Sequence, residues 1–558
     1  YKKERNDTVR FFKKFVAALT GVSIFLAGSA VSVSAEELPE YIRVGLRMSY
    51  EEKSAISIES KNIKLVRSDD GITSPLLNET MAEFTSSDGF TVRVGLSYQV
   101  AVPIDADSYD EALNEANSYI SDGYANAVPG YYKNNWAVII YGYSDMSSAN
   151  SAASSLNGIA LSPNDVIILD MGGNPILLIS NSDAYFMGDS GSVPVVDLGA
   201  RSYRGIIDFM QNDNGTITAV NILDLEEYLY GVVASEIPSS YAFESIKAQA
   251  CAARTYALYK WNRQSDVGFD ICDSTHCQAY MGYDYESDTT NRAVDETEGE
   301  LIYYNGKPIE ALFFSSSGGY TEDAVNVWGT DVAYLKAVDD SQEVNCPKWT
   351  RMLTLSDLDK LIAVNGYNIG SATGMRITVD NKTNRVQKLE ILGSKGTKTI
   401  TLEACRTVFG SIGDSFNSRN YTITNGDVSG GSTSSSNKIG TFVYGPIKDF
   451  KVGKNYVIGS DCAVVYATAN GIKAVGYDGK EVDTDDITGF DIDKTQTSGS
   501  SSKDGTTVIT SSGPTIEITG YGIGHGVGMS QMGANGMAQN GATYKEILKH
   551  YYTGVTVK

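Results

Sequence analysis

Glu236 is the carboxylate whose setting best suits acid–base chemistry. It lies between an apolar stretch and a loop that contains Pro238. Apolar neighbours raise the pKa of a carboxyl group, because loss of water disfavours the ion. A side chain that gives a proton to a leaving oxygen needs such a pKa. Spacing alone nevertheless favours an ordinary surface glutamate here, so other motifs must decide.

The elements around Glu236 are predicted from the pattern of residues 221–258. A strand-like first part leads into the loop with Pro238, and an amphipathic helix begins at about residue 243. On that helix, the side chains that could supply polar contacts, only some of which share a face, are Lys247, Gln249, Arg254 and Tyr256. The segment therefore predicts one carboxylate close to a polar helix face.

Cys272, His276 and Cys277 form a second group of reactive side chains. Zinc binds thiolate and imidazole ligands, and a structural zinc site needs four of them. The same spacing allows a Cys272–Cys277 disulfide, or two free thiols beside a hydrogen-bonded histidine. The residues alone leave these alternatives open. No H-E-x-x-H-type base accompanies the group, which argues against a zinc hydrolase.

Two runs of small residues are suited to close contact with a sugar chain. Residues 315–321 (SSSGGYT) follow an apolar strand and include Ser315 and Ser317. The glycine run 520–533 includes His525, Ser530 and Gln531 but lacks the lysine of a phosphate-binding loop. We therefore exclude nucleotide binding. A buried packing role for His525 is the competing interpretation.

Composition limits the class of protein. The chain has 558 residues, enough for two to four domains, and a formal net charge of −23. That acidity argues against a nucleic-acid partner, and a hydrophobic content of 42% argues against overall disorder. Short strands and scattered helices predict a β-rich α+β fold with several domains.

The pattern along the chain predicts five parts. Residues 1–14 are basic and 15–35 are uncharged, which predicts an export signal or membrane anchor and an extracytoplasmic body. Residues 36–182 are a β-rich region in which 91–182 show a β-α-β-α-β order, with helices at 108–121 and 145–156. Residues 183–425 and 505–558 form the two parts of a core. Ser/Gly linkers and a small β insertion occupy 426–504.

Several motifs in the same order resemble the stage II sporulation protein D family (SpoIID/LytB), which includes amidase enhancers. They are ASEIP with the helix to AARTYAL (234–258), CDSTHCQAY (272–280), FFSSSGGYTED (313–323) with Trp328, and GYGIGHGVGMSQMGANGMAQNG (520–541). The likeness covers about 200–345 and 505–558, with 346–425 also similar. Residues 91–182 are similar to a SPOR domain, a small module that binds glycan strands.

The resemblance implies a lytic transglycosylase that cleaves peptidoglycan glycan strands lacking stem peptides, with Glu236 as the catalytic acid. It implies a substrate groove formed by Lys247 and Arg254 on the helix and by the residues already named in the two small-residue runs, together with Gln278 and Tyr280. It also implies zinc at Cys272, His276 and Cys277. Relatives have a further histidine upstream that this chain lacks, so Asp266, Asp270 or Cys346 would have to supply a fourth ligand.

Two roles remain possible at this stage. One is the enzyme, acting in sporulation or in vegetative cell-wall remodelling. The other is a wall-binding protein that has no activity of its own and enhances a partner amidase. The intact ASEIP segment favours the enzyme, because a binding protein has no need of Glu236.

Overall fold

The computed structural model describes residues 41–67, 79–95, 97–163, 165–180, 182–189, 191–261, 265–274, 276–413, 415–425 and 506–558, with short strands between 450 and 482. The fold is α+β and rich in strands, as predicted. The predicted export segment 1–35 and the Ser/Gly linkers lie outside the described residues. None of the helices in the described part is long and apolar enough to cross a membrane.

A seven-stranded sheet supports the first candidate site. Its order is β17-β1-β16-β15-β12-β3-β4. The strands are β1 (Tyr41–Gly45), β3 (Asn62–Arg67), β4 (Glu79–Thr85), β12 (Ala184–Gly188), β15 (Ile206–Gln211), β16 (Ile217–Asp224) and β17 (Ile271–Cys272).

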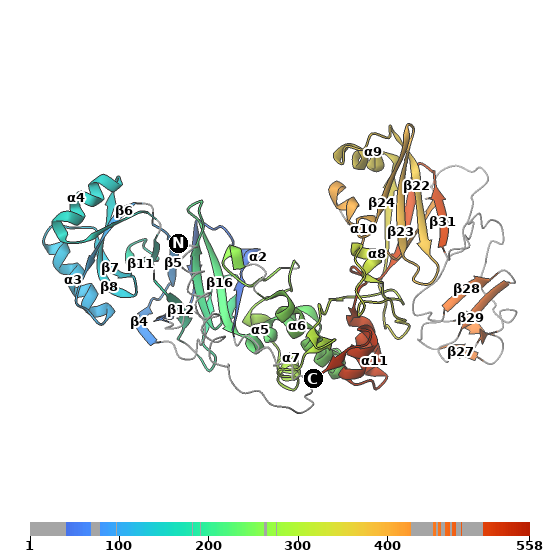
Figure 1. Ribbon diagram of the computed structural model, residues 1–558, viewed down its shortest axis with the longest axis horizontal. Coiled ribbons are helices and arrows are strands. Elements are labelled where there is room, and N and C mark those ends of the chain that lie inside the picture. Colours follow the sequence, from blue (N-terminus) through green and yellow to red (C-terminus); the bar gives the residue numbers. More distant parts are fainter. Residues whose placement is uncertain are drawn as a thin grey trace, which may run out of the picture. The chain divides into compact units, whose positions relative to one another are not determined.

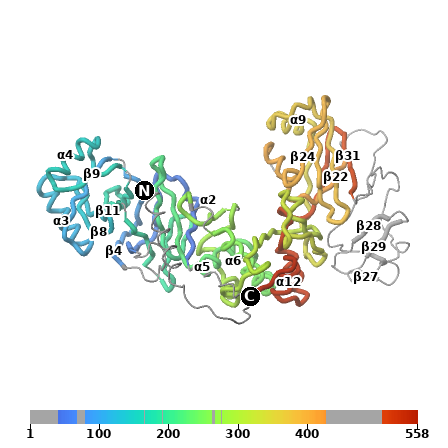
Figure 2. Tube along the Cα trace, in the orientation of Figure 1, coloured from blue at the N-terminus to red at the C-terminus, as the bar shows by residue number. Residues whose placement is uncertain are grey.

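Figure 2 shows how the two ends of this sequence range meet, with blue β1 beside green β16. Strands from residues 41–85 and 184–272 thus share one sheet and its hydrophobic core. The boundary predicted between residues 182 and 183 therefore does not separate two bodies, because the strands that pair across it are far apart in sequence.

A second sheet has the order β2-β5-β10-β11-β7-β8-β6-β9. Its strands are β2 (Ala55–Ile58), β5 (Phe90–Val94), β6 (Tyr98–Pro103), β7 (Ala127–Tyr132), β8 (Asn135–Tyr143), β9 (Ile159–Leu161), β10 (Val166–Asp170) and β11 (Pro175–Ser180). Helices α3 (Tyr109–Ser121) and α4 (Met146–Leu156) pack against it (Figure 1). Ser108 and Asp145 cap them, as expected for helix starts.

The predicted β-α-β-α-β order missed strand β7. Pro129 weakens the strand pattern of this stretch, because proline cannot donate to a ladder. The pairing of β7 with β11 starts only at Gly130, so β7 has a neighbour on one side alone at Pro129. From β6 to β9 the observed order is β-α-β-β-α-β, with β5 before it and β10 and β11 after it. The SPOR-like assignment stays a prediction.

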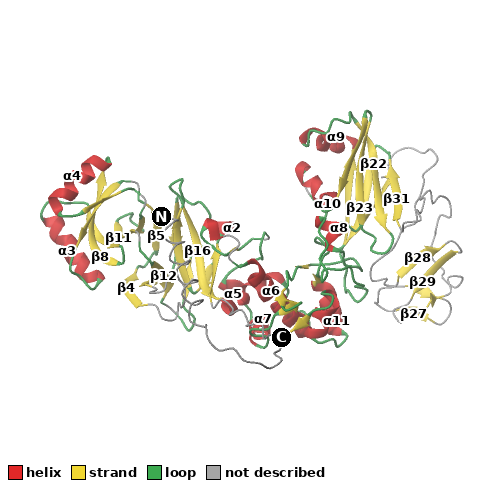
Figure 3. Ribbon diagram, viewed as in Figure 1, coloured by secondary structure: helices red, strands yellow, loops and turns green. Residues whose placement is uncertain are grey.

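Helices α5 (Leu225–Glu236), α6 (Phe243–Lys260) and α7 (Asp288–Asp295) contact one another beside the first sheet (Figure 3). Sequence analysis missed α5, whose Tyr and Val residues resembled a strand. Its buried side chains recur at helical spacing, and Asp224 caps it by accepting from the N–H groups of Glu226 and Glu227. The predicted α6 begins at residue 243.

Residues 346–425 form a second core that the C-terminal part completes. The sheets are β21-β32-β25 and β24-β23-β22-β31. Their strands are β21 (Lys348–Thr354), β22 (Ala372–Asp380), β23 (Val386–Gly393), β24 (Gly396–Thr401), β25 (Tyr421–Asn425), β31 (Thr506–Ser511) and β32 (Thr515–Tyr521), and α9 spans Leu355–Val364. Chain segments on both sides of 426–504 therefore share one core.

Within 426–504 the structure describes five short strands. They are β26 (Phe450–Val452), β27 (Tyr456–Ile458), β28 (Val464–Thr468), β29 (Gly471–Val475) and β30 (Glu481–Val482). After β32 the chain forms β33 (Met529–Ser530), α11 (Gln531–Gln539) and the predicted C-terminal helix α12 (Tyr544–Tyr551). The predicted β insertion stays a prediction.

Candidate active site

Glu236 is the last residue of α5 and is half-buried. Its Oε1 accepts a hydrogen bond from the backbone N–H of Ala279 at 2.7 Å. The neighbouring Ser235 Oγ accepts from the N–H of Met281 at 3.1 Å. The segment 279–281 therefore holds the end of α5 at two successive residues and fixes the direction of the carboxyl group.

Gln531, the first residue of α11, is the second partner of Glu236 and hydrogen-bonds its carboxyl group. The Gln531 Nε2 also donates to Oε1 of Gln249 at 3.4 Å. Gln249 lies on α6 and is fully buried. Sequence analysis placed Gln249 among the polar residues of the predicted helix but did not assign it to the substrate groove.

Burial raises the pKa of Glu236, and the hydrogen bonds from Ala279 and Gln531 lower it again in part. The net direction is upward. A carboxyl group with this balance holds its proton at higher pH than an exposed glutamate and can still stabilise the carboxylate after the proton is given away. This is the behaviour expected of a residue that acts first as acid and then as base.

The two small-residue runs meet beside Gln531. Strand β20 (Phe313–Phe314) pairs in parallel with β33, with Phe314 opposite Ser530. Ser530 caps α11 by accepting from the N–H of Gly533, and the carbonyl of Ser315 accepts from the N–H of Met532. The structure thus brings Ser315, Ser530 and Gln531 together near Glu236, as the sequence analysis expected.

Glu343 holds the serine run from behind. Its carboxylate accepts from the Ser316 and Ser317 hydroxyls and from the Gly318 N–H at 2.8 Å. Glu343 is only 4% exposed, so these donors replace the water it has lost. Ser317 is therefore occupied by a framework contact, which differs from its predicted contact with substrate.

His525 lies in the turn of the glycine run. Gly528 adopts φ +82°, and a side chain there would meet the carbonyl of Leu312, which explains the need for glycine. The His525 Nδ1 accepts from the N–H of Val527 at 3.1 Å. Burial and two nearby arginines lower the pKa of His525 to about 4, so the imidazole is neutral at pH 7.

Four other predicted site residues are held by contacts within the protein. Arg254 is fully buried and donates to both carboxylate oxygens of Glu226, at 2.7 and 2.6 Å. Tyr280 donates its hydroxyl to Asn221 Oδ1 at 2.7 Å, and Gln278 Nε2 donates to the Tyr228 hydroxyl at 3.4 Å. These three contacts belong to the framework behind the site.

Lys247 is the fourth of these residues. Its ammonium group lies 3.3 Å from Glu244 and 3.5 Å from Glu296, and 4.5 Å from the centre of the Tyr544 ring. The helix end that carries Glu236 is not among its contacts. The contact of Lys247 with substrate stays a prediction.

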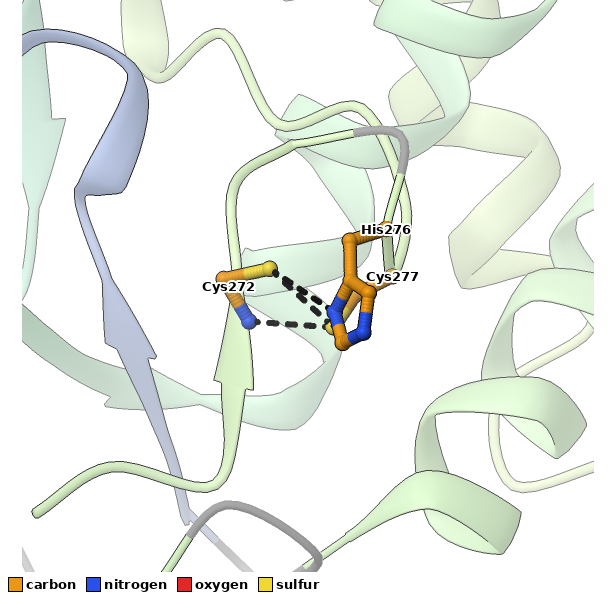
Figure 4. A group of neighbouring side chains, drawn as sticks. All are labelled: Cys272, His276 and Cys277. Carbon is orange, nitrogen blue, oxygen red and sulfur yellow. Dashed lines mark hydrogen bonds between the residues drawn. The ribbon is translucent and has the colours of Figure 1, made fainter. Parts of the chain in front are cut away.

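Cys272, His276 and Cys277 come together as predicted (Figure 4). Cys272 ends β17, which pairs with β1, and the other two residues follow in the next turn. The two Sγ atoms are 3.2 Å apart, and His276 Nδ1 lies 3.8 Å from Cys272 Sγ and 3.5 Å from Cys277 Sγ. The structure holds the cysteines as thiols rather than as a disulfide.

The donor set fits zinc. Tetrahedral coordination with Zn–S near 2.3 Å and Zn–N near 2.0 Å separates the donor atoms by roughly 3.5–3.8 Å. Hydrogen bonds from Cys277, Ser274 and His276 lower the pKa of the Cys272 thiol, which favours the thiolate that a metal binds. Zinc would thus have three protein ligands here.

None of the residues predicted as a fourth ligand joins this group within the described part of the chain. Asp270 accepts from the backbone N–H of Arg43 at 2.9 Å. Cys346 Sγ lies 3.9 Å from Ser316 Oγ, in the serine run. Asp266 stands in the short turn Ser265–Val267. Within the described residues, the group therefore offers three ligands to a metal.

Comparison with known proteins adds the family. Residues 213–304 match the model of the stage II sporulation protein family SpoIID, a range that holds Glu236 and the Cys/His group. Over this range the chain is similar to the SpoIID family. Over 332 residues it is 31% identical to an amidase enhancer of Bacillus subtilis (strain 168), covering 59% of this chain and 40% of that protein.

Two further relatives match over most of their length. The stage II sporulation protein D of Bacillus subtilis (strain 168) is 28% identical over 356 residues, which cover 61% of this chain and 76% of that protein. An uncharacterized protein of Brachyspira hyodysenteriae is 29% identical over 357 residues, covering 64% of this chain and 72% of that protein. The recognition made from the motifs is therefore confirmed at the level of the family.

Proposed function

We propose that this protein is an extracytoplasmic lytic transglycosylase that cleaves peptidoglycan glycan strands lacking stem peptides. The observation that carries the proposal is the setting of Glu236, a half-buried carboxyl group with a raised pKa and only neutral partners. Those partners are a backbone N–H and an amide, neither of which can act as a nucleophile or as a second base. The site thus suits a reaction that needs a single carboxyl group.

The reaction can be written with Glu236 alone. Its carboxylic acid gives a proton to the glycosidic oxygen as the bond from that oxygen to the anomeric carbon breaks. The resulting carboxylate then takes the proton of the sugar's own 6-hydroxyl, and that oxygen bonds to the anomeric carbon. The product is a 1,6-anhydro end, and Glu236 regains its proton. Glycosidases that use water commonly need two carboxyl groups.

Each partner of Glu236 has a defined part in this cycle. The N–H of Ala279 and the amide of Gln531 stabilise the carboxylate formed after proton transfer. Burial favours the acid before transfer. The serine and glycine runs beside Gln531 offer small side chains, which allow a sugar chain to approach the backbone closely.

We propose zinc at Cys272, His276 and Cys277 as a structural element. When bound, zinc would supply a rigid crosslink between β17 and the turn that follows it. Cys277 stands two residues before Ala279, whose N–H donates to Glu236. An ordered Cys277 therefore helps to keep the 279–281 segment in place, without the metal taking part in the reaction.

A second candidate function follows from the amidase enhancer. That relative is the most identical of the three described here, although the match covers less than half of it. In this alternative the protein binds glycan strands and enhances a partner amidase without cleaving the strands. The SPOR-like region at 91–182 would support either function, because two weak sugar contacts on one chain add through effective concentration.

The direct test is product analysis on peptide-free glycan strands. The purified protein and its Glu236→Gln variant would be incubated with the strands, and the products read by mass spectrometry. Shortened strands with 1,6-anhydro ends, absent with the variant, would support the transglycosylase. Intact strands that co-sediment with both proteins would leave only the binding and amidase-enhancer function.

A further inference from the structure

Trp328 presents an exposed indole at the end of a short helix. It is the last residue of α8 (Ala324–Trp328), and 44% of its surface is exposed. The backbone beside it is well fixed, since Gly329 caps the helix in the left-handed conformation and the Val327 carbonyl accepts from the N–H of Glu403. A large apolar side chain is therefore held in a defined place at the surface.

The surroundings extend Trp328 into a patch. Its ring centre lies 5.3 Å from that of His525, and the His525 ring lies 5.4 Å from that of Phe314. Two further apolar side chains, each 38% exposed, extend the patch. Ile523 stands two residues before His525 in the glycine run, and Leu402 lies beside Gly329. Because the His525 imidazole is neutral at pH 7, the patch carries no charge at this position.

The patch is linked to Glu236 by a continuous path of contacts. Phe314, which touches His525, pairs with Ser530 in the β20–β33 ladder. Gln531 follows Ser530 directly and hydrogen-bonds Glu236. The aromatic patch and the candidate acid are therefore both connected to the strand pair β20–β33.

This arrangement matches the surface of a pyranose ring. Such a ring has an apolar face of C–H groups and a rim of hydroxyls, and an indole has a broad apolar face with one N–H at its edge. An isolated exposed hydrophobic residue needs no explanation. A fixed tryptophan beside a neutral imidazole and a run of small polar residues, connected to a half-buried acid, has the composition of a sugar site.

We propose that Trp328, supported by His525, forms a sugar-stacking subsite for a ring of the glycan strand whose bond is cleaved at Glu236. The inference rests on the proposed function for the identity of the strand. It adds a substrate contact at Trp328, which the family motifs do not assign to a role.

The test measures binding with cleavage removed. Three proteins would be compared by co-sedimentation with peptide-free glycan strands. All three carry Glu236→Gln; the second also carries Trp328→Ala, and the third also carries Trp261→Ala. Trp261 is the matched control, because it is 43% exposed and stands at the end of α6. We expect Trp328→Ala to weaken binding by about tenfold and Trp261→Ala to leave it unchanged. Equal affinities of all three proteins would overturn the subsite.

A second measurement covers the case in which Trp328→Ala does not fold. In the Glu236→Gln protein, short peptide-free glycan fragments should quench tryptophan fluorescence. The quench should persist in Trp261→Phe and disappear in Trp328→Phe, because Trp136 and Trp349 are each only 6% exposed. A quench that survives Trp328→Phe would overturn the inference.

The binding results separate this inference from the proposed enzyme. Strand cleavage by the wild-type protein tests the enzyme, whereas the affinity of the inactive protein tests the subsite. Cleavage together with unchanged binding in Trp328→Ala would reject the subsite alone. Weakened binding without any wild-type cleavage would reject the enzyme and retain a Trp328 sugar site.

Discussion

Glu236 and the Cys272–His276–Cys277 group are two chemical centres joined by one short segment, yet their surroundings are opposite in kind. Glu236 is one ionisable group among neutral partners, a backbone N–H and an amide. The other centre consists of three soft or borderline donors directed at one another, within 4.8 Å. The first suits the movement of a proton, and the second suits a fixed ligand set.

This difference indicates that the two groups have separate roles in the fold. The Cys/His group is attached to the first sheet through β17, and the chain after it donates to Ser235 and Glu236. The Cys/His group therefore lies at the end of this segment that is held by the sheet, and the half-buried carboxyl group of Glu236 contacts its other end. A substitution of Glu236 should then lower activity with little loss of stability. A substitution in the Cys/His group should lower stability more than activity.

The largest expected effect is the loss of activity in Glu236→Gln. Removal of a general acid is expected to lower the rate of strand cleavage by about 10²–10⁴-fold. The exposed Glu298 provides a matched control, and Glu298→Gln should retain full activity. Residual cleavage within twofold of the wild-type rate, taken here as about the limit of the assay, would exclude Glu236 as the acid.

The same variant should not lose stability at pH 7. Because burial raises the pKa of Glu236 above its unfolded value, the folded protein binds more protons than the unfolded chain between the two pKa values. This contribution to the free energy of unfolding falls as pH rises through that window. Glutamine has no charge to bury, so thermal unfolding of Glu236→Gln at pH 7 should occur at or above the wild-type temperature.

The next effect concerns the metal centre. Zinc that binds only the folded state adds about 2.7 kcal/mol to the free energy of unfolding at a hundredfold excess over its Kd. Zinc should therefore raise the temperature of thermal unfolding of the wild-type protein, and it should do the same for Glu236→Gln. Cys277→Ser should abolish this increase. A zinc-independent unfolding temperature in the wild-type protein would contradict a metal site and favour two structural thiols.

A smaller effect is expected at Tyr280, which was predicted to contact substrate. Its hydroxyl donates to Asn221 Oδ1, and both side chains are almost fully buried. Tyr280→Phe leaves that buried oxygen without its hydroxyl donor, which should lower the free energy of unfolding by about 1–3 kcal/mol. Chemical denaturation measures the loss. A raised KM for glycan strands at unchanged stability would instead restore the substrate-binding interpretation.

Sequence analysis identified the motifs that meet at the site, because they are local and chemically distinctive. Glu236, the Cys/His group, and the serine and glycine runs all lie where the structure brings polar groups together. It could not foresee which polar side chains would be used internally. Arg254 is held by Glu226, and Ser317 by Glu343, over separations of more than twenty residues.

The errors in the fold have the same origin. Helix α5 was missed because its aromatic and β-branched residues favour strands, whereas Asp224 and the buried helical stripe determine the outcome. The boundary at 182 was misplaced because strands β1 and β3 pair with strands more than one hundred residues away. Pairing at that distance leaves no signal in a single sequence.

The smallest effect should come from Gln531, which contacts Glu236 without taking part in proton transfer. Its hydrogen bond favours the carboxylate, so Gln531→Ala should raise the pKa of Glu236 further. Activity that needs the acid form falls as pH rises through this pKa, and the falling limb of the kcat/KM profile should therefore move to higher pH. The exposed Gln539, at the far end of α11, provides the control Gln539→Ala, whose profile should match the wild type. A limb that moves to lower pH in Gln531→Ala would contradict this prediction. It would mean that the Gln531 amide stabilises the protonated acid of Glu236 rather than the carboxylate.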